Sequence, residues 1–207
     1  ELFADSGYEI KEFTEVADVY VINTCSVTNM GDRKSRQIIR RAKKLNPNAV
    51  IAVTGCYAQT APDEVLAIEG VNLVLGTKDR KNIVTLVEEL NTESNINHVS
   101  DIMSNHEFEE LQIKQYSNRT RAFIKIQEGC NQFCSYCIIP YARGPVRSRA
   151  KDDVVREIKE LAHNGFKEII LVGIHVASYG VDLGDTTLES LIMDVDKIDG
   201  VERIRLS

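Results

Sequence analysis

The first part of the chain alternates short apolar runs with stretches of helical spacing. The apolar runs are rich in valine and isoleucine and are short, which is typical of strands covered on both faces of a parallel sheet. The predicted strands are residues 17–23, 48–54 and 72–75. The predicted helices are residues 31–45, a short helix beginning at Pro62, and residues 79–90. This alternation predicts an α/β fold, with a doubly wound parallel sheet in a domain of residues 1–90.

The pattern changes after residue 90. Residues 91–120 are polar and carry a cluster of glutamates, Glu107, Glu109 and Glu110, so we expect a linker with at most one short ordered element. From Arg121 the alternation returns. The predicted strands are residues 122–127, 168–172 and 201–206, and the predicted helices are residues 152–163, capped by Gly165, and 187–198. This order of elements predicts the start of a TIM-like barrel over residues 121–207.

Composition adds limits rather than a function. Hydrophobic residues make up 43% and charged residues 27% of the 207 positions, which is ordinary for a globular protein. No apolar run approaches the roughly 20 residues of a membrane span, so we expect a cytoplasmic protein that does not contact the membrane. The net charge is −6, and any contact with nucleic acid must therefore come from a local basic patch. The chain begins at Glu1 inside a helix-like stretch and stops at Ser207 after a strand-like run, and we expect it to be truncated at both ends.

Three cysteines stand close together in the run GCNQFCSYC. Cys130, Cys134 and Cys137 have the spacing C-x3-C-x2-C, with Tyr136 just before the last of them. Thiolate is the soft ligand that selects iron–sulfur clusters, and a four-iron cluster normally takes four cysteines. Three cysteines leave one iron open for a small molecule. The spacing resembles the signature of the radical S-adenosylmethionine (SAM) superfamily, in which SAM binds that iron.

Zinc is the alternative metal that this cysteine triad could bind. Structural zinc takes four cysteine or histidine ligands, usually as two pairs. No second pair follows Cys137, and the nearest downstream histidine, His163, falls on a predicted helix. A disulfide framework is a weaker alternative still, because the chain has five cysteines, an odd number, and no secretory signal.

The other two cysteines share a context. Cys25 and Cys56 each come directly after a predicted strand. The carboxyl ends of parallel strands meet at one edge of the sheet, where ligands of α/β proteins bind. The two thiols are therefore candidate cluster ligands. The alternative is that each is a small buried side chain at a strand end, which is common for cysteine.

Taken together, these motifs resemble the radical SAM methylthiotransferases, the family that includes MiaB, RimO and MtaB, and within it the MtaB type. The resemblance rests on Asn23–Cys25 (NTC), Thr54–Cys56 (TGC) and the run CNQFCSYCIIPYARGPVRSR at residues 130–149. In that family an N-terminal α/β domain binds an auxiliary 4Fe–4S cluster through three cysteines, a partial barrel binds SAM, and an RNA-binding TRAM domain follows. The first auxiliary cysteine would lie before Glu1, so the auxiliary cluster is doubtful in these residues alone.

The resemblance implies a reaction and a set of site residues. MtaB-type enzymes add a methylthio group to C2 of N6-threonylcarbamoyladenosine in tRNA, and a RimO-type reaction on a ribosomal protein is the alternative. The implied ligands are Cys130, Cys134 and Cys137 for the SAM-binding 4Fe–4S cluster, and Cys25 and Cys56 for the auxiliary one. The implied SAM contacts are Tyr136, Gly173 and His175, although His175 is as readily a structural histidine. The implied partners are tRNA and an electron-donor protein, and the sulfur source is unknown.

Basic residues supply the candidates for RNA contact. Seven of them crowd the helix predicted at residues 31–45: Arg33, Lys34, Arg36, Arg40, Arg41, Lys43 and Lys44. Such a face is suited to phosphates, although a charged face is more often simply solvated. Arg143, Arg147 and Arg149 follow the cysteine loop and are candidates for phosphate, the SAM carboxylate or the cluster. A metal-stabilised binding module without catalysis is the alternative from another functional class.

Overall fold

The computed structural model describes residues 2–25, 29–110 and 121–207, and these form two compact units. The first unit contains the residues up to Asn105 together with Cys134–Arg143, and the second contains His106–Phe133 and Gly144–Ser207. Residues 111–120 of the predicted linker lie outside the described residues. No helix in the described ranges combines the length and the apolar character needed to cross a lipid bilayer.

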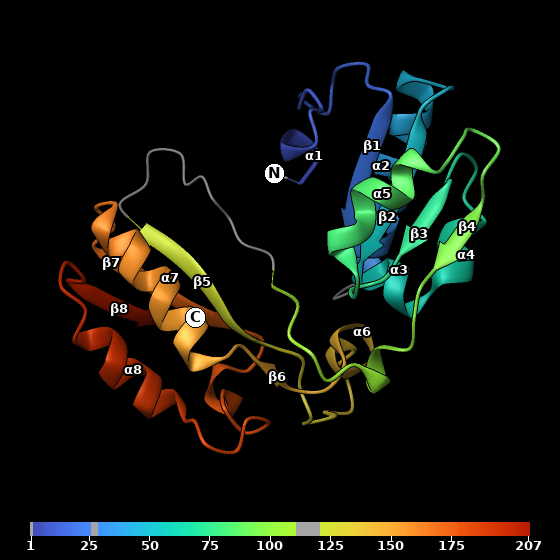
Figure 1. Cartoon of the computed structure of the whole chain (residues 1–207). Coiled ribbons are helices and arrows are strands. Elements are labelled where there is room, and N and C mark those ends of the chain that lie inside the picture. The colour runs from blue at the N-terminus through green and yellow to red at the C-terminus, as the bar shows by residue number, and fades with distance from the viewer. Residues whose placement is uncertain (1, 26–28, 111–120) are drawn as a thin grey trace. The chain divides into compact units, whose positions relative to one another are not determined.

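The first unit is built on a parallel sheet in which the strand order follows the chain (Figure 1). Its strands are β1 (Val19–Thr24), β2 (Val50–Gly55), β3 (Leu73–Leu75) and β4 (Ile96–His98). Its helices are α1 (Leu2–Asp5), α2 (Asn29–Leu45), α3 (Cys56–Thr60), α4 (Pro62–Leu66), α5 (Ile83–Glu88) and α6 (Ile139–Arg143), with the 3-10 turns η1 (Arg80–Asn82) and η2 (Ile102–Ser104). Each strand and helix predicted from the apolar pattern of residues 1–90 is present, with ends shifted by a few residues.

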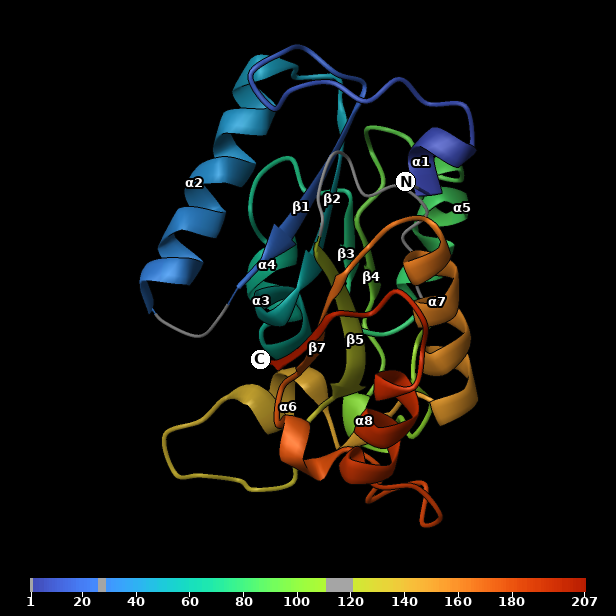
Figure 2. The ribbon, with the colours of Figure 1, turned by 90° about the vertical axis from the view of Figure 1, so that its left-hand side faces the viewer.

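Helices cover both faces of this sheet, which is why its middle strands β2 and β3 are buried along almost their whole length. Ile39 and Ala42 of α2 pack with Ile51 and other side chains on one face. Ile83 and Val87 of α5 pack with the opposite face. Figure 2 places α2 on one side of the sheet and α1 and α5 on the other. The predicted α/β architecture is confirmed.

Part of the predicted linker belongs to this sheet. Strand β4 pairs in parallel with β3. The side chain of Asn72, which is buried, organises the connection: its Oδ1 accepts from the Ile51 amide at 2.9 Å, and its Nδ2 donates to the carbonyls of Thr92 and Ser94, each at 3.1 Å. One buried amide therefore fixes a polar segment that has no apolar pattern of its own, and the first unit extends to Asn105.

The second unit has the order β6-β5-β7-β8, with β5, β7 and β8 parallel and β6 antiparallel to β5. Its strands are β5 (Arg121–Glu128), β6 (Arg147–Ser148), β7 (Glu168–Gly173) and β8 (Arg203–Leu206). Its helices are α7 (Lys151–His163) and α8 (Leu188–Asp196), with the 3-10 turn η3 (Val176–Ser178). Ile124 of β5, Ile158 of α7 and Leu191 of α8 are in one buried core. The predicted start of a TIM-like barrel is confirmed.

The amino-terminal ends of the three parallel strands share one carboxylate. Glu168 of β7 lies opposite Arg121 of β5 and Arg203 of β8 in the strand register. Its Oε2 is 3.0 Å from Arg121 Nε and 3.9 Å from Arg203 Nη1, and its Oε1 pairs with Arg205. The Glu168 side chain is 12% exposed, whereas the arginine side chains are 51–63% exposed. One half-buried carboxylate therefore links three neighbouring strands.

Candidate metal and cofactor site

The cysteine loop begins at the carboxyl end of β5 and is fixed where it leaves and re-enters the second unit. The backbone amide of Cys130 donates to the Gly144 carbonyl at 3.0 Å. The Asn131 side chain accepts from the Val146 amide, also at 3.0 Å. These two bonds hold the entry and exit of the loop together, so that Cys130 has a defined backbone position.

Gly129 is required directly before Cys130. Its φ is +75°, a left-handed conformation that glycine adopts without steric cost. A Cβ at this position would lie 1.8 Å from the Pro145 carbonyl oxygen. The chain therefore enters the cysteine loop through a backbone crossing too close for any side chain.

The three thiols of the loop differ in exposure. Cys134 is exposed, whereas Cys130 and Cys137 are half-buried, and the Cys137 amide donates to the Cys134 carbonyl at 2.9 Å in a tight turn. Tyr136 is 90% exposed. Among the described residues, no three histidine, cysteine or acidic side chains converge at metal-binding spacing. The fit to an iron–sulfur cluster thus rests on donor chemistry, since three accessible thiols on one loop supply the ligands that such a cluster takes.

The segment with Cys134 and Cys137 packs inside the first unit. It continues into α6, which contacts α3, the helix that begins with Cys56. Thr77, which follows β3 and is 2% exposed, donates its hydroxyl to the Ala142 carbonyl at 2.8 Å. The Thr77 amide in turn donates to Gln59 Oε1 of α3 at 2.9 Å. These bonds hold α6 against the carboxyl edge of the first sheet.

Cys25 and Cys56 follow neighbouring strands of that edge. Strands β1 and β2 are parallel, and Thr24 lies opposite Gly55 in their register. The strands approach so closely that a Cβ on Gly55 would lie 2.3 Å from the Thr24 carbonyl oxygen. Cys25 is exposed and Cys56 is buried. The two cysteines thus start adjacent segments, as their matched sequence context predicts.

The predicted SAM-contact residues of the second unit lie at the carboxyl end of β7. Gly173 is the last residue of that strand, and His175 follows. The His175 amide donates to Gln127 Oε1 at 2.9 Å, and its Nδ1 lies 2.5 Å from Ser178 Oγ. The imidazole therefore has a local partner on one nitrogen. Sequence reasoning does not single out Gln127, because a lone glutamine in a strand has no motif.

Some basic residues of α2 are exposed to solvent, whereas Arg36 is hydrogen-bonded within the protein. Arg33 and Arg40 are exposed. Arg36 is half-buried, lies over the Tyr57 ring and donates from Nη1 to the Tyr57 hydroxyl at 2.8 Å. Tyr57 in turn donates to Glu64 at 3.2 Å. Arg36 therefore ties α2 to the helix that begins with Cys56, whereas Arg33 and Arg40 remain candidates for phosphate.

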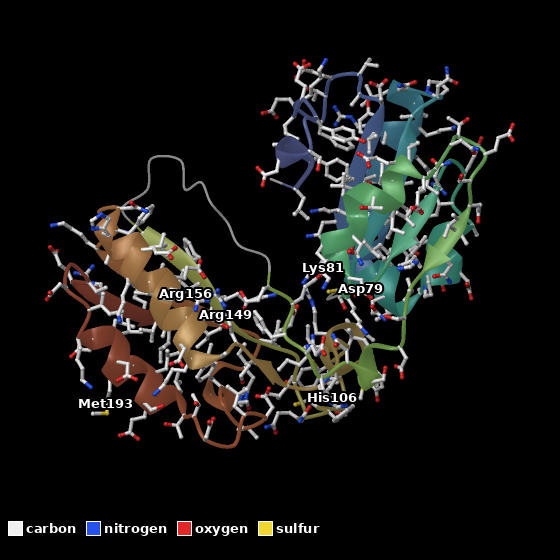
Figure 3. All side chains as sticks on the ribbon, viewed as in Figure 1. Asp79, Lys81, His106, Arg149, Arg156 and Met193 are labelled. Carbon is white, nitrogen blue, oxygen red and sulfur yellow. The ribbon has the colours of Figure 1, made fainter. Side chains whose placement is uncertain are left out.

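Two of the arginines predicted as candidates for phosphate, the SAM carboxylate or the cluster are buried. Arg147 is 2% exposed, donates to the Pro145 carbonyl at 3.0 Å and lies 3.8 Å from Glu128. Arg149, just ahead of α7, is 5% exposed and pairs with Glu110 and Glu157 (Figure 3). Burial alone would lower the pKa of Arg149, but hydrogen bonds to both carboxylates raise it.

Buried charges are normally paired in this way, because an unpaired charge is costly to remove from water. Arg147 and Arg149 are thus already paired with carboxylates of the protein, and their role as contacts for RNA, SAM or the cluster stays a prediction. Arg143, at the end of α6, is half-buried and also stays a candidate for these contacts.

Two family models match this chain. Residues 1–76 match the family described as "Uncharacterized protein family UPF0004", and residues 124–207 match the "Radical SAM superfamily". A protein of Bacillus subtilis (strain 168), "Threonylcarbamoyladenosine tRNA methylthiotransferase MtaB", is 51% identical over 100% of this chain and 46% of its own length. A protein of the same name from Aquifex aeolicus (strain VF5) is 44% identical over 99% of this chain and 50% of its own length.

Two further comparisons concern a less similar relative with a different name and a solved structure with a similar fold. A "tRNA-2-methylthio-N(6)-dimethylallyladenosine synthase" of Sulfurihydrogenibium sp. (strain YO3AOP1) is 38% identical over 97% of this chain and 47% of its own length. The chain thus spans about half the length of the curated relatives it matches. The structure of the radical S-adenosylmethionine methyltransferase TsrM from Kitasatospora setae, with cobalamin and a [4Fe-4S] cluster bound, has a TM-score of 0.55 at 14% identity, covering 93% of this chain and 46% of TsrM. This likeness shows the fold alone.

Proposed function

We propose that this chain, which is similar to radical SAM methylthiotransferases of the MtaB type, contributes to adding a methylthio group to C2 of N6-threonylcarbamoyladenosine in tRNA. The observation that carries the proposal is the C-x3-C-x2-C loop at the carboxyl end of β5. In barrels of this kind the active site lies at the carboxyl ends of the strands. Gly173 and His175 lie at the same edge, because β7 is parallel to β5.

Cys130, Cys134 and Cys137 are the residues that would hold the SAM-binding 4Fe–4S cluster. When bound, the cluster and SAM supply one-electron chemistry that no side chain of the protein can supply. The chain's own contribution is placement. Gly129 and the Cys130–Gly144 hydrogen bond set the start of the loop, and the exposed thiol of Cys134 leaves room for a cluster to be inserted.

The SAM contacts on the β7 side are limited by bonds that are already made. The His175 amide is engaged by Gln127, and its Nδ1 by Ser178. Any polar contact of His175 with SAM would therefore use Nε2. Gly173 presents backbone without a side chain, and the exposed ring of Tyr136 is available to cover an adenine. We keep all three residues as proposed contacts.

Cys25 and Cys56 are the proposed ligands of the auxiliary cluster. Both stand at the edge where α/β proteins bind ligands, on segments that leave adjacent strands. Two thiols are fewer than a 4Fe–4S cluster normally takes, so a further ligand has to come from elsewhere in the enzyme.

The proposed partner is tRNA, with Arg33, Arg40 and Arg143 as candidate phosphate contacts. Two relatives are tRNA methylthiotransferases by name and a third is a tRNA-2-methylthio-N(6)-dimethylallyladenosine synthase by name, which favours tRNA over the ribosomal protein of a RimO-type reaction. We also propose a cytoplasmic location, where tRNA is modified, and a separate electron-donor protein. The source of the sulfur is a further partner that these residues do not specify.

The test is mass spectrometry of tRNA nucleosides from a strain that lacks the gene. The full-length gene should restore the 2-methylthio form of N6-threonylcarbamoyladenosine, whereas Cys134→Ala should not. Ser135→Ala, a change of one of the two exposed residues between the two thiols of the turn, is the matched control and should restore it. Normal tRNA together with a ribosomal protein that has lost a methylthio group would favour the RimO-type alternative. Purified protein that holds zinc and no iron or sulfide would favour the non-catalytic module.

A further inference from the structure

The geometry points to Gln127 as a positioning residue, which holds the backbone before Cys130 against the loop that carries His175 and thereby sets the affinity of the site for SAM. This inference rests on the proposed function, in which Cys130 ligates the cluster and the loop after β7 contacts SAM. Gln127 itself lies in neither motif. All of the contacts that support the inference lie within the second unit.

Gln127 bonds to both loops at once. Its Nε2 donates to the carbonyls of Glu128 and Gly129, at 2.8 and 2.7 Å. Its Oε1 accepts from the His175 amide at 2.9 Å. The residue is 0% exposed, so water cannot replace these bonds. A single side chain thus joins the peptide directly before Cys130 to the first turn after β7.

The strands are shaped to admit this side chain. The register between β5 and β7 shifts between Lys125 and Gln127, an irregularity of the kind that re-aims a side chain beside a functional site. Gln127 then lies opposite Gly173. A Cβ on Gly173 would be 2.8 Å from Gln127 Oε1 and 3.1 Å from Gln127 Cβ. Gly173 therefore makes the space through which Gln127 reaches His175.

Glutamine is suited to this role by its length and by its two kinds of polar atom. Glutamate has a similar shape but would place a carboxylate against two carbonyl oxygens and would have no N–H to donate. Asparagine is shorter by one methylene and cannot span both loops from the same backbone position. Leucine and methionine fill the space but leave the Gly129 carbonyl and the His175 amide without this partner, in a place that water does not enter.

The first measurement needs no cofactor. Amide hydrogen exchange of His175 should become faster in Gln127→Leu, by up to about tenfold, which is the typical contribution of one hydrogen bond. Ile124→Val is the matched control, because Ile124 is buried in the same strand without bonding either loop, and exchange at His175 should stay at the wild-type rate. Unchanged exchange in Gln127→Leu would overturn the structural link. If Gln127→Leu does not fold, Gln127→Met replaces it.

The second measurement uses the full-length enzyme, reconstituted with iron and sulfide without oxygen. Gln127→Leu should bind as much iron as the wild type, because the thiols are intact, but its dissociation constant for SAM should rise by about tenfold, because the two loops are no longer held in place before SAM binds. The change in the electron paramagnetic resonance spectrum on adding SAM should weaken in parallel. Ile124→Val should match the wild type in both respects.

Three outcomes separate the possibilities. An unchanged SAM affinity in Gln127→Leu, with faster exchange at His175, would show that the link exists but does not serve SAM, and would overturn the inference. A loss of iron binding in that variant would also overturn the inference, because Gln127 would then be needed for the cysteine loop to bind the cluster and not only to hold the two loops together for SAM. A wild-type enzyme that binds neither iron nor SAM would instead overturn the proposed function.

Discussion

Thr77 and Ala142 are joined by a hydrogen bond across 65 positions of the chain, from the Thr77 hydroxyl to the Ala142 carbonyl at 2.8 Å. Thr77 follows the third strand of the first sheet, and Ala142 is in the helix that follows Cys137. The bond therefore fixes the end of the cysteine segment to the edge of the sheet at which Cys25 and Cys56 start. It relates two sets of thiols that are far apart in sequence.

Thr77→Val tests this bond. Valine has nearly the shape of threonine but cannot donate to Ala142, and Thr77 is 2% exposed, so the substitution leaves a buried carbonyl without its partner. We expect the free energy of unfolding to fall by about 1–2 kcal/mol in urea titrations. Thr77→Ser keeps the hydroxyl and should recover most of this stability. Equal stability of the valine and serine variants would contradict the role given to the hydroxyl.

A pair of glycine substitutions tests the entry to the cysteine loop. Gly129 and Gly165 both have a positive φ, +75° and +89°, but only Gly129 lies against backbone, whereas a Cβ on Gly165 would meet nothing within 4 Å. Gly165→Ala should therefore cost only the conformational strain of about 1–2 kcal/mol. Gly129→Ala adds a collision, should cost more than about 3 kcal/mol, and should lower iron uptake on reconstitution. Thermal unfolding and iron content would measure both, and two variants of equal stability would contradict the crossing at Gly129.

Tyr179 predicts a loss of stability in alkali. Burial and the charge of Asp182 raise the pKa of Tyr179 to about 12, from the ordinary value of 10.0. Between these two values the unfolded chain has released the phenolic proton while the folded protein retains it, so stability falls as the pH rises through this window. The expected loss from this residue is about 2–3 kcal/mol by pH 12.

Tyr179→Phe is the control for this pH dependence. Phenylalanine has no proton to lose, although it gives up the hydrogen bond that the Tyr179 hydroxyl donates to the Arg149 carbonyl at 2.9 Å. We expect the variant to be less stable than the wild type near neutral pH, and the difference to shrink or reverse in alkali. Unfolding curves that stay parallel across this range would show that Tyr179 titrates as it does in water.

The exposed basic residues of α2 predict a salt-dependent affinity for tRNA in the full-length enzyme. Phosphate contacts release counterions, so the slope of log affinity against log salt should flatten by about 0.7–0.9 for each phosphate that a substitution leaves without its arginine. We expect this flattening in Arg33→Ala/Arg40→Ala, whereas the matched pair Arg156→Ala/Lys159→Ala on α7 should behave as the wild type. An equal flattening for both pairs of substitutions would indicate that the net charge of the protein, rather than contacts made by α2, sets the salt dependence. Arg36→Ala should instead lower stability, because Arg36 is bonded to Tyr57.

The strands and long helices can be predicted well from the sequence, because their apolar patterns are set by burial. The pattern predicts α2 at residues 31–45, and the helix spans Asn29–Leu45; it predicts β7 at residues 168–172, and the strand spans Glu168–Gly173. The short elements α3, α6 and β6 are not predicted. They are held in place by bonds to distant residues, such as the one from Thr77 to Ala142, and no local pattern encodes them.

Some features of the candidate site can likewise be predicted from the sequence, and others cannot. Cysteine spacing and strand ends are visible in the sequence, and the structure starts Cys25 and Cys56 from adjacent strands. The fate of an arginine is not visible there, because it depends on carboxylates that fold next to it. Arg149 meets Glu110 from the predicted linker and Glu157 from α7, and so is buried, whereas Arg33 is exposed to solvent. The role of Gln127 also cannot be predicted from the sequence, because its bond to the His175 amide forms only when β7 pairs with β5.

The carboxylate of Glu168 has a consequence for mutational tolerance. Removal of Arg121, Arg203 or Arg205 alone leaves it with two of its three cationic neighbours, and each of these exposed pairs contributes little by itself. Removal of Glu168 leaves three positive groups facing one another with no counter-charge between them. The loss of any one of these arginines should therefore cost less stability than the loss of Glu168, which removes all three pairs at once. Substitutions at this end of the sheet should accordingly be tolerated more readily at a single arginine than at the glutamate.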